Sequence, residues 1–322
     1  MSAMLRRGVL AFGVLLAAAT TASAQSGTLT LGTASVGGTY FVYGEAVARL
    51  LTDKARLSVA TQQTQGPNQN MILVDEQKMA LGMVTMGVAL QGFTGTAPWT
   101  KGRKLENVRA LFPMYDTPLQ CVALKKSGIS GFRGLDGKTV GVGPKAGTPG
   151  TYFPMIFEAL GIKVSVRNGQ NIDMGHQLQD GVVDAFCSAA GLPIPAFADL
   201  DAAEPVSFFT WTDAELAAIH KAMPEFTATV IPKGIYKQQT ADQKTVGLFN
   251  FAIANKEMPA DLAYTITRTV LENSATLARA HPAGKATIAA NASRNTVLPF
   301  HPGAVRYYKE KGIKLDPATL PK

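Results

Sequence analysis

Histidine and cysteine are scarce in this chain of 322 residues, and neither forms a pattern that could hold a metal ion. Metal sites need ligands at characteristic short spacings. The four histidines lie far apart, at His176, His220, His281 and His301. The two cysteines have no histidine pair near them. We therefore expect neither a metal ion nor a cofactor.

Signatures of catalysis and of nucleic-acid binding are also missing. Ser35 lies in Gly32–Gly37, which is not a G-x-S-x-G nucleophile elbow. Residues Gly141–Gly147 partly match a dinucleotide-binding fingerprint, but the glycine spacing is one residue too long and Pro144 occupies the turn. The basic residues are scattered and form no stripe with interleaved aromatics. The sequence thus predicts a protein that is not an enzyme and does not bind nucleic acid.

No apolar run after the N-terminus is long enough to span a bilayer, which needs about 20 residues. The N-terminus itself reads as a cleaved signal peptide over residues 1–25. Arg6 and Arg7 form a basic region, an apolar run follows from Gly8 to Ala19, and Ala22–Ala24 gives the small-x-small cleavage pattern. An uncleaved anchor or a buried helix is the alternative. Cleavage would lower the net charge from +8 to +6 and leave a soluble periplasmic protein.

Two α/β units follow one another in the mature chain. Strands near 29–32 and 57–61 alternate with helices, and residues 81–89 are expected to form a buried strand that enters a helix, which is typical of a sheet covered on both faces. The alternation restarts with strands near 119–124, 138–143, 163–167 and 182–187. A final strand near 245–254 and two helices return to the first unit. We predict lobe 1 from residues 26–116 plus 226–322 and lobe 2 from 117–225, joined around a cleft by two hinge crossings near residues 115–119 and 227–245.

Three glycine-rich loops follow strands and precede helices, at Gly32–Thr39, Gly66–Asn70 and Gly143–Thr151. In open α/β sheets such loops lie at the carboxyl ends of the strands, where ligands bind. Helix N-termini there present free N–H groups that favour an anion. Each loop taken alone could be an ordinary turn. All three in one chain favour a shared cleft for an anionic group.

The cysteines permit two interpretations. Cys121 and Cys187 both lie in apolar, strand-like runs. They could be two buried thiols that act as small hydrophobes. They could also form a disulfide, because an exported protein folds in an oxidising compartment.

Several motifs, taken together, resemble the TAXI-type solute receptors of tripartite (TRAP) transporters over essentially the whole mature chain. In chain order they are Gly37–Tyr40, Gly66–Asn70, Gly181–Ala185, Gly191–Pro193, Ile231–Tyr236 and His301–Glu310. The resemblance implies a class II periplasmic-binding-protein fold that closes on a small carboxylate or amino acid. It also implies delivery of that ligand to an inner-membrane TRAP permease, and a structural role for the helix after His301.

The chain departs from this family pattern at three ligand-facing places. Pro67 follows Gly66 where the family commonly has serine, and Thr85–Gly87 stands where the family commonly has Gln-Ser-Asp. The loop Ala146–Thr151 replaces Gly-Ser-Gly-Thr. Because Gly87 lacks the carboxylate that would neutralise an ammonium group, we predict a carboxylate without an α-amine, such as a keto, dicarboxylic or aromatic acid. The alternative is that Asp184 or Glu45 supplies that charge for a glutamate-like ligand.

A set of glycine, hydroxyl and amide residues is predicted to line the cleft, with Tyr40 covering an apolar part of the ligand and Lys145 adding charge. The set is Gly38, Thr39, Tyr40, Asn70, Thr85, Lys145, Thr148, Thr151 and Tyr152. The protein is expected to act as a monomer with a permease as its partner. A sensor subunit for a membrane kinase and a pyrimidine-synthesising enzyme on the same fold are the alternative functions.

Overall fold

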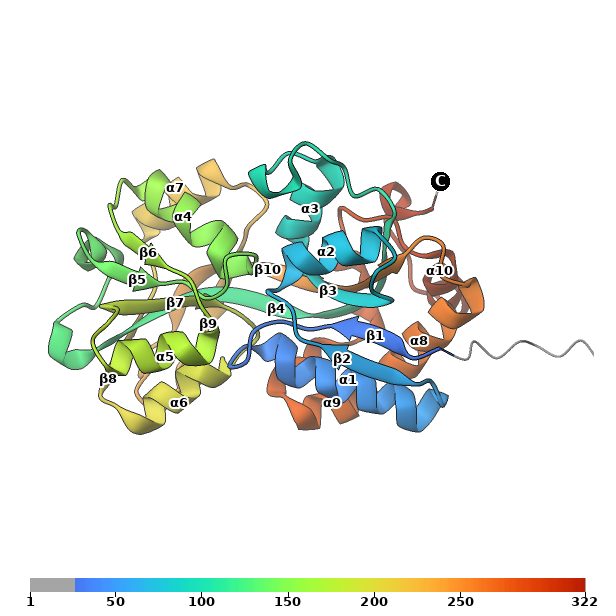
Figure 1. Cartoon of the computed structure of the whole chain (residues 1–322), viewed down its shortest axis with the longest axis horizontal. Helices are drawn as coiled ribbons and strands as arrows, with labels where there is room; N and C mark the ends of the chain where they lie inside the picture. Colours follow the sequence, from blue (N-terminus) through green and yellow to red (C-terminus); the bar gives the residue numbers. More distant parts are fainter. Residues whose placement is uncertain (1–26, 322) are drawn as a thin grey trace, which may run out of the picture.

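The computed structural model describes residues 27–321. The predicted signal peptide lies outside this range. Within it, no helix is both long and apolar enough to cross a bilayer. Strands and helices alternate along most of the chain and form two lobes side by side (Figure 1).

Ten strands of the described residues form one sheet. They are β1 (Leu29–Gly32), β2 (Val59–Gln62), β3 (Leu81–Thr85), β4 (Val108–Leu124), β5 (Thr139–Gly141), β6 (Ser165–Arg167), β7 (Ala185–Ala189), β8 (Val206–Phe209), β9 (Thr227–Ile231) and β10 (Gln243–Asn255). Their order is β2-β1-β3-β10-β4-β7-β5-β6, with β8 beside β4 and β9 beside β10. The sheet therefore runs without a break from one lobe to the other.

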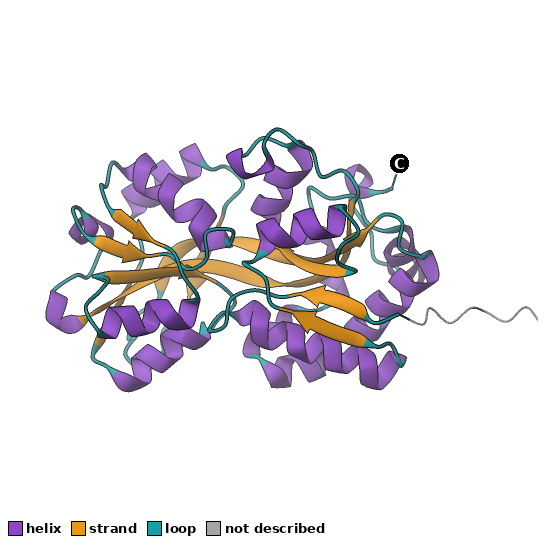
Figure 2. Ribbon diagram, in the orientation of Figure 1, coloured by secondary structure: helices purple, strands orange, loops and turns teal. Residues whose placement is uncertain are grey.

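The α-helices cover both faces of this sheet (Figure 2). They are α1 (Thr39–Ala55), α2 (Pro67–Asp75), α3 (Met86–Thr94), α4 (Thr148–Leu160), α5 (Asn171–Gln179), α6 (Pro195–Ala203), α7 (Asp213–Ala222), α8 (Ala260–Glu272), α9 (Ser274–Ala280) and α10 (Pro302–Glu310). In Figure 1, lobe 1 contains α1 to α3 and α8 to α10, and lobe 2 contains α4 to α7.

The two long strands β4 and β10 connect the lobes. β4 pairs with β10 as far as Pro118 and then, from Leu119, with β7 and β8. The crossing predicted near residues 115–119 thus lies inside one continuous strand. The second predicted crossing, between 227 and 245, contains β9, which pairs with β10. The lobe boundaries at 116/117 and 225/226 stay a prediction.

Pairing directions divide the sheet into two kinds of segment. β1 pairs in parallel with β2 and β3, and β5 does so with β6 and β7, as the alternation predicted. β10 is antiparallel to β3 and β4, and β4 is antiparallel to β7. The sequence analysis recognised only residues 119–124 of β4. The missed half is buried on both faces and so shows no alternation of apolar and polar residues.

Local sequence explains several helix ends. α4 ends at Gly161, whose φ of 65° is the left-handed conformation that suits glycine at this position. α7 begins with a capping box in which the side chains of Thr212 and Glu215 each accept a backbone N–H of the other residue. α8 buries one face, with Ile266 and Val270 fully covered.

The C-terminal motif after His301 is structural. Nδ1 of His301 accepts the N–H of Gly303 at 3.2 Å and so caps α10, and the backbone N–H of His301 donates to Ala110 in β4. Tyr308 donates its hydroxyl to the carbonyl of Leu111 at 2.9 Å. These bonds attach α10 to β4 of lobe 1, as the resemblance implied.

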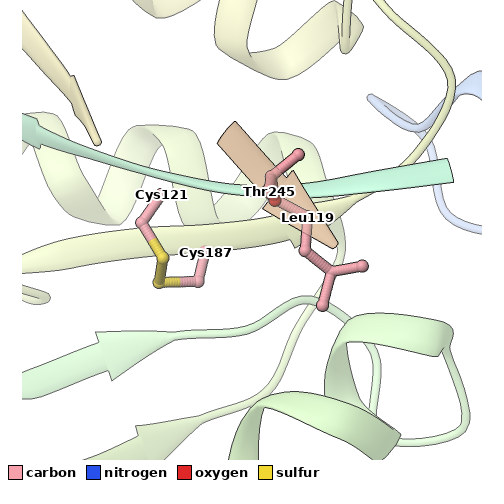
Figure 3. The surroundings of a disulfide bond; sticks show 4 residues. All are labelled: Leu119, Cys121, Cys187 and Thr245. Carbon is pink, nitrogen blue, oxygen red and sulfur yellow. A yellow bond between two sulfur atoms is a disulfide. The ribbon is translucent and has the colours of Figure 1, made fainter. Parts of the chain in front are cut away.

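Cys121 and Cys187 form a disulfide (Figure 3). The two residues face each other in the antiparallel pair β4 and β7, and both are fully buried. The sequence was compatible with either a disulfide or two free thiols, and the structure shows the disulfide. It covalently joins the strand that crosses between the lobes to the sheet of lobe 2.

Candidate functional site

Five α-helices begin around one small cavity, which we call the helix-end pocket. The residues before α1, α2, α3 and α4 line it, and these are Gly38, Gly66, Thr85 and Gly147. Asn171, the first residue of α5, lines it too. At the starts of α1, α2, α3 and α4 no capping side chain takes up the free N–H groups, whereas at α5 the hydroxyl of Ser35 accepts the N–H of Asn171. The cavity therefore meets the positive ends of five helix dipoles.

The two lobes close tightly over this pocket. Gly66 has a φ of 124°, and a side chain there would lie 3.0 Å from the Cα atom of Gly147 in lobe 2. Pro67 occupies the first turn of α2, where its missing N–H costs no helical hydrogen bond. Glycine thus lets the backbones of lobe 1 and lobe 2 meet directly at the edge of the cavity.

The polar side chains of the pocket come from both lobes. Oγ1 of Thr85 and Oγ1 of Thr148 lie 3.2 Å apart across the cleft. Thr39 donates its hydroxyl to the carbonyl of Gly191 at 2.6 Å. Tyr40 donates its hydroxyl to Oδ1 of Asn250 at 2.6 Å, and complete burial raises the pKa of Tyr40 far above its usual value. The tyrosine is therefore neutral at physiological pH.

Charge is supplied here only by backbone dipoles. Among residues 27–321, no lysine, arginine, histidine, aspartate or glutamate lines the helix-end pocket. Asp184 accepts the backbone N–H of Thr139 instead, and Glu45 accepts the hydroxyl of Thr61. Neither acid lines the pocket, so neither supplies a counter-charge for an ammonium group in this arrangement.

The cavity is small in this closed arrangement. Its volume is about 40 Å³. A buried water needs about 10–15 Å³ of such space, so there is room for about three non-hydrogen atoms. That is the size of a carboxylate group.

Five of the nine predicted site residues line this pocket: Gly38, Thr39, Tyr40, Thr85 and Thr148. Two others, Lys145 and Thr151, line a neighbouring cavity. Asn70 and Tyr152 line neither. Nδ2 of Asn70 donates to the carbonyls of Thr33 and Met83 at 3.0 and 2.9 Å, which holds β1 and β3 to α2.

Four polar residues of the pocket were missed by the sequence analysis, namely Ser35, Gln65, Thr117 and Asn171. A signal for Asn171 existed, because Gly169 follows β6 and precedes α5 in the same strand–loop–helix order as the other loops. Ser35 lay inside a loop that was recognised, and its Oγ accepts the N–H of Asn171 at 2.7 Å across the lobes. Thr117 gave no signal, since it lies within a buried strand.

The neighbouring cavity, which we call the Trp99 pocket, is larger, at about 790 Å³. Its wall in lobe 1 includes Leu90 and Trp99, and its wall in lobe 2 includes Met155 and Thr151. Gln65 lines both cavities. The two cavities therefore lie next to each other between the same pair of lobes.

No group of three or more His, Cys, Asp or Glu side chains that could hold a metal ion occurs among residues 27–321. Nδ1 of His281 accepts the N–H of Ala283, and Nε2 of His281 lies 3.0 Å from the carbonyl of Pro193, so this ring joins the two lobes. Burial lowers the pKa of His281.

A family model matches residues 31–312, almost all of the described chain. The chain belongs to the NMT1-like family. Among solved structures, the periplasmic binding protein BugD aligns with a TM-score of 0.58 at 11% identity, over 90% of this chain and 99% of that chain. An ancestral arginine-binding protein, solved with arginine, aligns with a TM-score of 0.50 at 14% identity, over 80% of this chain and 97% of that chain.

At such low identities these alignments show the fold alone. This member of the NMT1-like family has the two-lobed α/β fold of periplasmic substrate-binding proteins, and the predicted fold class is confirmed. The helix-end pocket lies between its two lobes.

Proposed function

We propose that this protein is an extracytoplasmic receptor that captures a small carboxylate between its lobes and delivers it to a membrane permease. The convergence of five helix N-termini, four of them without a capping side chain, on a cavity without acidic side chains carries this proposal. Free N–H groups and aligned helix dipoles stabilise an anion, and only Ser35, which accepts the N–H of Asn171, competes for one of these groups. The cavity has the size of the carboxylate group itself.

The site that we propose is narrower than the set predicted from the sequence. In our proposal Thr85 and Thr148, whose hydroxyls lie 3.2 Å apart, donate these hydroxyls to the two carboxylate oxygens from opposite lobes. Gly38 and Thr39 contribute the N-terminus of α1, and Tyr40 closes the pocket beside them. Lys145 and Thr151 belong to the Trp99 pocket, so no lysine pairs with the carboxylate.

The same pocket argues for a ligand without an α-amine. A desolvated ammonium group needs acceptors and usually a carboxylate partner. Neither Asp184 nor Glu45 lines the pocket, and position 87 is a glycine. An amino acid would therefore bring a positive charge towards five positive helix ends.

The periplasmic location and the TRAP permease rest on the leader sequence and on the motifs shared with TAXI-type receptors. The disulfide supports export, because such bonds persist in oxidising compartments.

Thermal denaturation of the mature protein with matched ligand pairs tests the proposal. Glutarate and glutamate differ by the α-amine, and glutarate and glutaramide differ by the negative charge. We expect glutarate to raise the midpoint most, because a ligand at 100 times its Kd adds about 2.7 kcal/mol of stability. Equal stabilisation by glutaramide, or tighter binding of glutamate, would contradict it.

A further inference from the structure

The helix-end pocket is too small to enclose a complete organic acid. It holds about three non-hydrogen atoms, which a carboxylate group fills by itself. The rest of any larger ligand must therefore lie outside this cavity. The Trp99 pocket is adjacent and is about 790 Å³ in volume, within the usual range of ligand sites.

Only a thin wall separates the two cavities. It consists of the backbones of Gly66 and Gly147, which approach each other from opposite lobes, with Gln65 lining both sides. Asn68 makes the hydrogen bonds that span the wall: its backbone N–H donates to the carbonyl of Ala146 at 3.4 Å, and its side-chain amide donates to the hydroxyl of Thr151 at 3.2 Å. Both distances are at or beyond the long end of the usual range, so these bonds are weak.

A single turn of helix α4 contributes lining residues to both cavities. Thr148 lines the helix-end pocket, and Thr151 lines the Trp99 pocket. A molecule held by its carboxylate at Thr148 thus has the Trp99 pocket directly along the same helix. A small separation of the two lobes would merge both cavities into one groove.

The walls of the Trp99 pocket carry large apolar side chains that the protein leaves exposed. Leu90 from α3 is 36% exposed and Met155 from α4 is 38% exposed. Trp99, from the short 3-10 helix Pro98–Thr100, is half-buried, and its indole N–H is already donated to Oε1 of Gln91. Exposed apolar surface on both walls of a groove is typical of a ligand site.

The charged residues of the Trp99 pocket do not favour a ligand group of either charge. Lys145 and Glu225 have opposite signs, and the Glu225 carboxylate accepts the hydroxyl of Tyr152 at 3.0 Å. The polar remainder, which includes Gln65, Asn68 and Thr151, consists of neutral amides and hydroxyls. An uncharged, largely apolar group is therefore the best complement to its walls.

We infer that the ligand is a carboxylate with an apolar tail, aromatic or branched, whose tail occupies the Trp99 pocket between Leu90, Trp99 and Met155. This inference rests on the proposed binding of the carboxylate in the helix-end pocket and adds the chemistry of the other end. Binding of the tail separates Gly66 from Gly147 and breaks the weak bonds of Asn68 with Ala146 and Thr151. The exposed side chains of both lobes then bury their surface against one molecule.

Titration calorimetry with acetate, butyrate and 3-phenylpropionate tests the inference on the mature protein. Each methylene group that becomes buried should strengthen binding about fourfold. We expect butyrate to bind more tightly than acetate, and 3-phenylpropionate most tightly, each with one molecule per chain. Benzyl alcohol, which lacks the carboxylate, should bind far more weakly.

Two variants locate the tail. Leu90→Gln and Met155→Gln, in opposite lobes, should each weaken 3-phenylpropionate binding several-fold, on the order of one or two methylene groups, without changing the acetate affinity. Val182→Gln, at an exposed apolar residue of lobe 2 outside both pockets, is the matched control and should change neither. Unchanged acetate binding also shows that each variant is folded.

The outcomes separate this inference from the proposed function. Equal affinities along the series, or variants that bind 3-phenylpropionate like the wild type, would overturn the tail site while carboxylate binding stands. Benzyl alcohol binding as tightly as 3-phenylpropionate, or a second molecule per chain, would show an independent apolar site and would also overturn it. Failure of every carboxylate, acetate included, would remove the proposed function itself.

Discussion

At the scale of single residues, the missing side chain of Gly87 has two consequences, one for the charge of the site and one for the steric fit of the lobes. The sequence indicated that an expected acid is absent there. The structure adds a steric reason, because a Cβ atom on Gly87 would lie 2.2 Å from the hydroxyl oxygen of Tyr152 in the opposite lobe. Tyr152 is held in place by its hydrogen bond to Glu225, and burial raises its pKa well above the usual value. The neutral tyrosine thus occupies the space that an acid would need, and only glycine lets the lobes meet at this point.

Gly87→Ala should therefore weaken ligand binding about tenfold, because overpacking a tight contact costs about 1–3 kcal/mol. Tyr152→Phe in the same chain removes the atom that the new methyl group meets, so the double variant should recover most of the affinity. Isothermal titration with a carboxylate measures both.

Gly175→Ala is the matched control for this pair. It lies inside α5 of lobe 2, where a Cβ atom would lie 3.8 Å from Leu200, an ordinary contact. Its affinity should equal that of the wild type. If Gly87→Ala binds as tightly as this control, the contact with Tyr152 does not limit closure.

At the scale of elements, β4 is the part of the molecule that joins the two lobes. Two contacts fix its position close to the crossing (Figure 3). The hydroxyl of Thr245 in β10 donates to the carbonyl of Leu119 at 2.6 Å, and the disulfide joins Cys121 to Cys187 in β7. The half of β4 in lobe 2 is thereby attached to both neighbouring strands. We therefore expect β4 to bend on closure at the junction between its attached half in lobe 2 and the part that pairs with β10 in lobe 1.

The disulfide should matter for stability rather than for binding. It closes a loop of 66 residues, for which loop-closure entropy gives a stabilisation of about 4 kcal/mol, at the upper end of the usual 2–4. Chemical denaturation of the Cys121→Ala, Cys187→Ala double variant should show a correspondingly lower free energy of unfolding. Its carboxylate affinity should be unchanged, since neither cysteine lines either pocket.

Reductant provides the control for this experiment. It should lower the unfolding midpoint of the wild type and leave that of the double variant unchanged. An equal free energy of unfolding for the wild type and the double variant would show that the bond adds nothing to stability.

At the scale of the whole molecule, the structure is a closed arrangement of two lobes. Backbone hydrogen bonds run directly between them, from Ile172 to Val36 at 3.2 Å and from Ala196 to Gly37 at 3.1 Å. Thr85 and Thr148 meet on the other side of the helix-end pocket. Contacts on both sides narrow the approach to this pocket, so we expect a ligand to enter when the lobes separate.

Small-angle scattering should therefore show a smaller radius of gyration when a saturating carboxylate is added to the ligand-free protein. We expect the lobes to turn about β4 and β10 and the ligand to favour the closed state, because only there would both lobes contact it. The Gly87→Ala variant at saturating ligand should compact less. An unchanged radius for the wild type with a ligand verified by calorimetry would contradict hinge closure.

The sequence by itself determined the local units of this protein. Strand–loop–helix repeats, the glycine that ends α4 and the apolar face of α8 depend on residues that are close together in the chain, so their pattern could be read directly. The same locality predicted that helix N-termini would line one cleft, since each such loop follows a strand and opens a helix. The carboxyl half of β4 was recognised, whereas its other half was hidden by uniform burial.

Only the tertiary structure decided which residues share a cavity. Thr148 and Thr151 stand three residues apart on α4 and were predicted to share one cleft, yet the backbone of Gly66 from the other lobe divides them between two pockets. Asn171 and Thr117 joined the site through contacts with distant segments, and Cys121 met Cys187 because β4 and β7 pair. Such contacts join residues tens of positions apart, and their geometry depends on how whole elements pack, which no local pattern encodes.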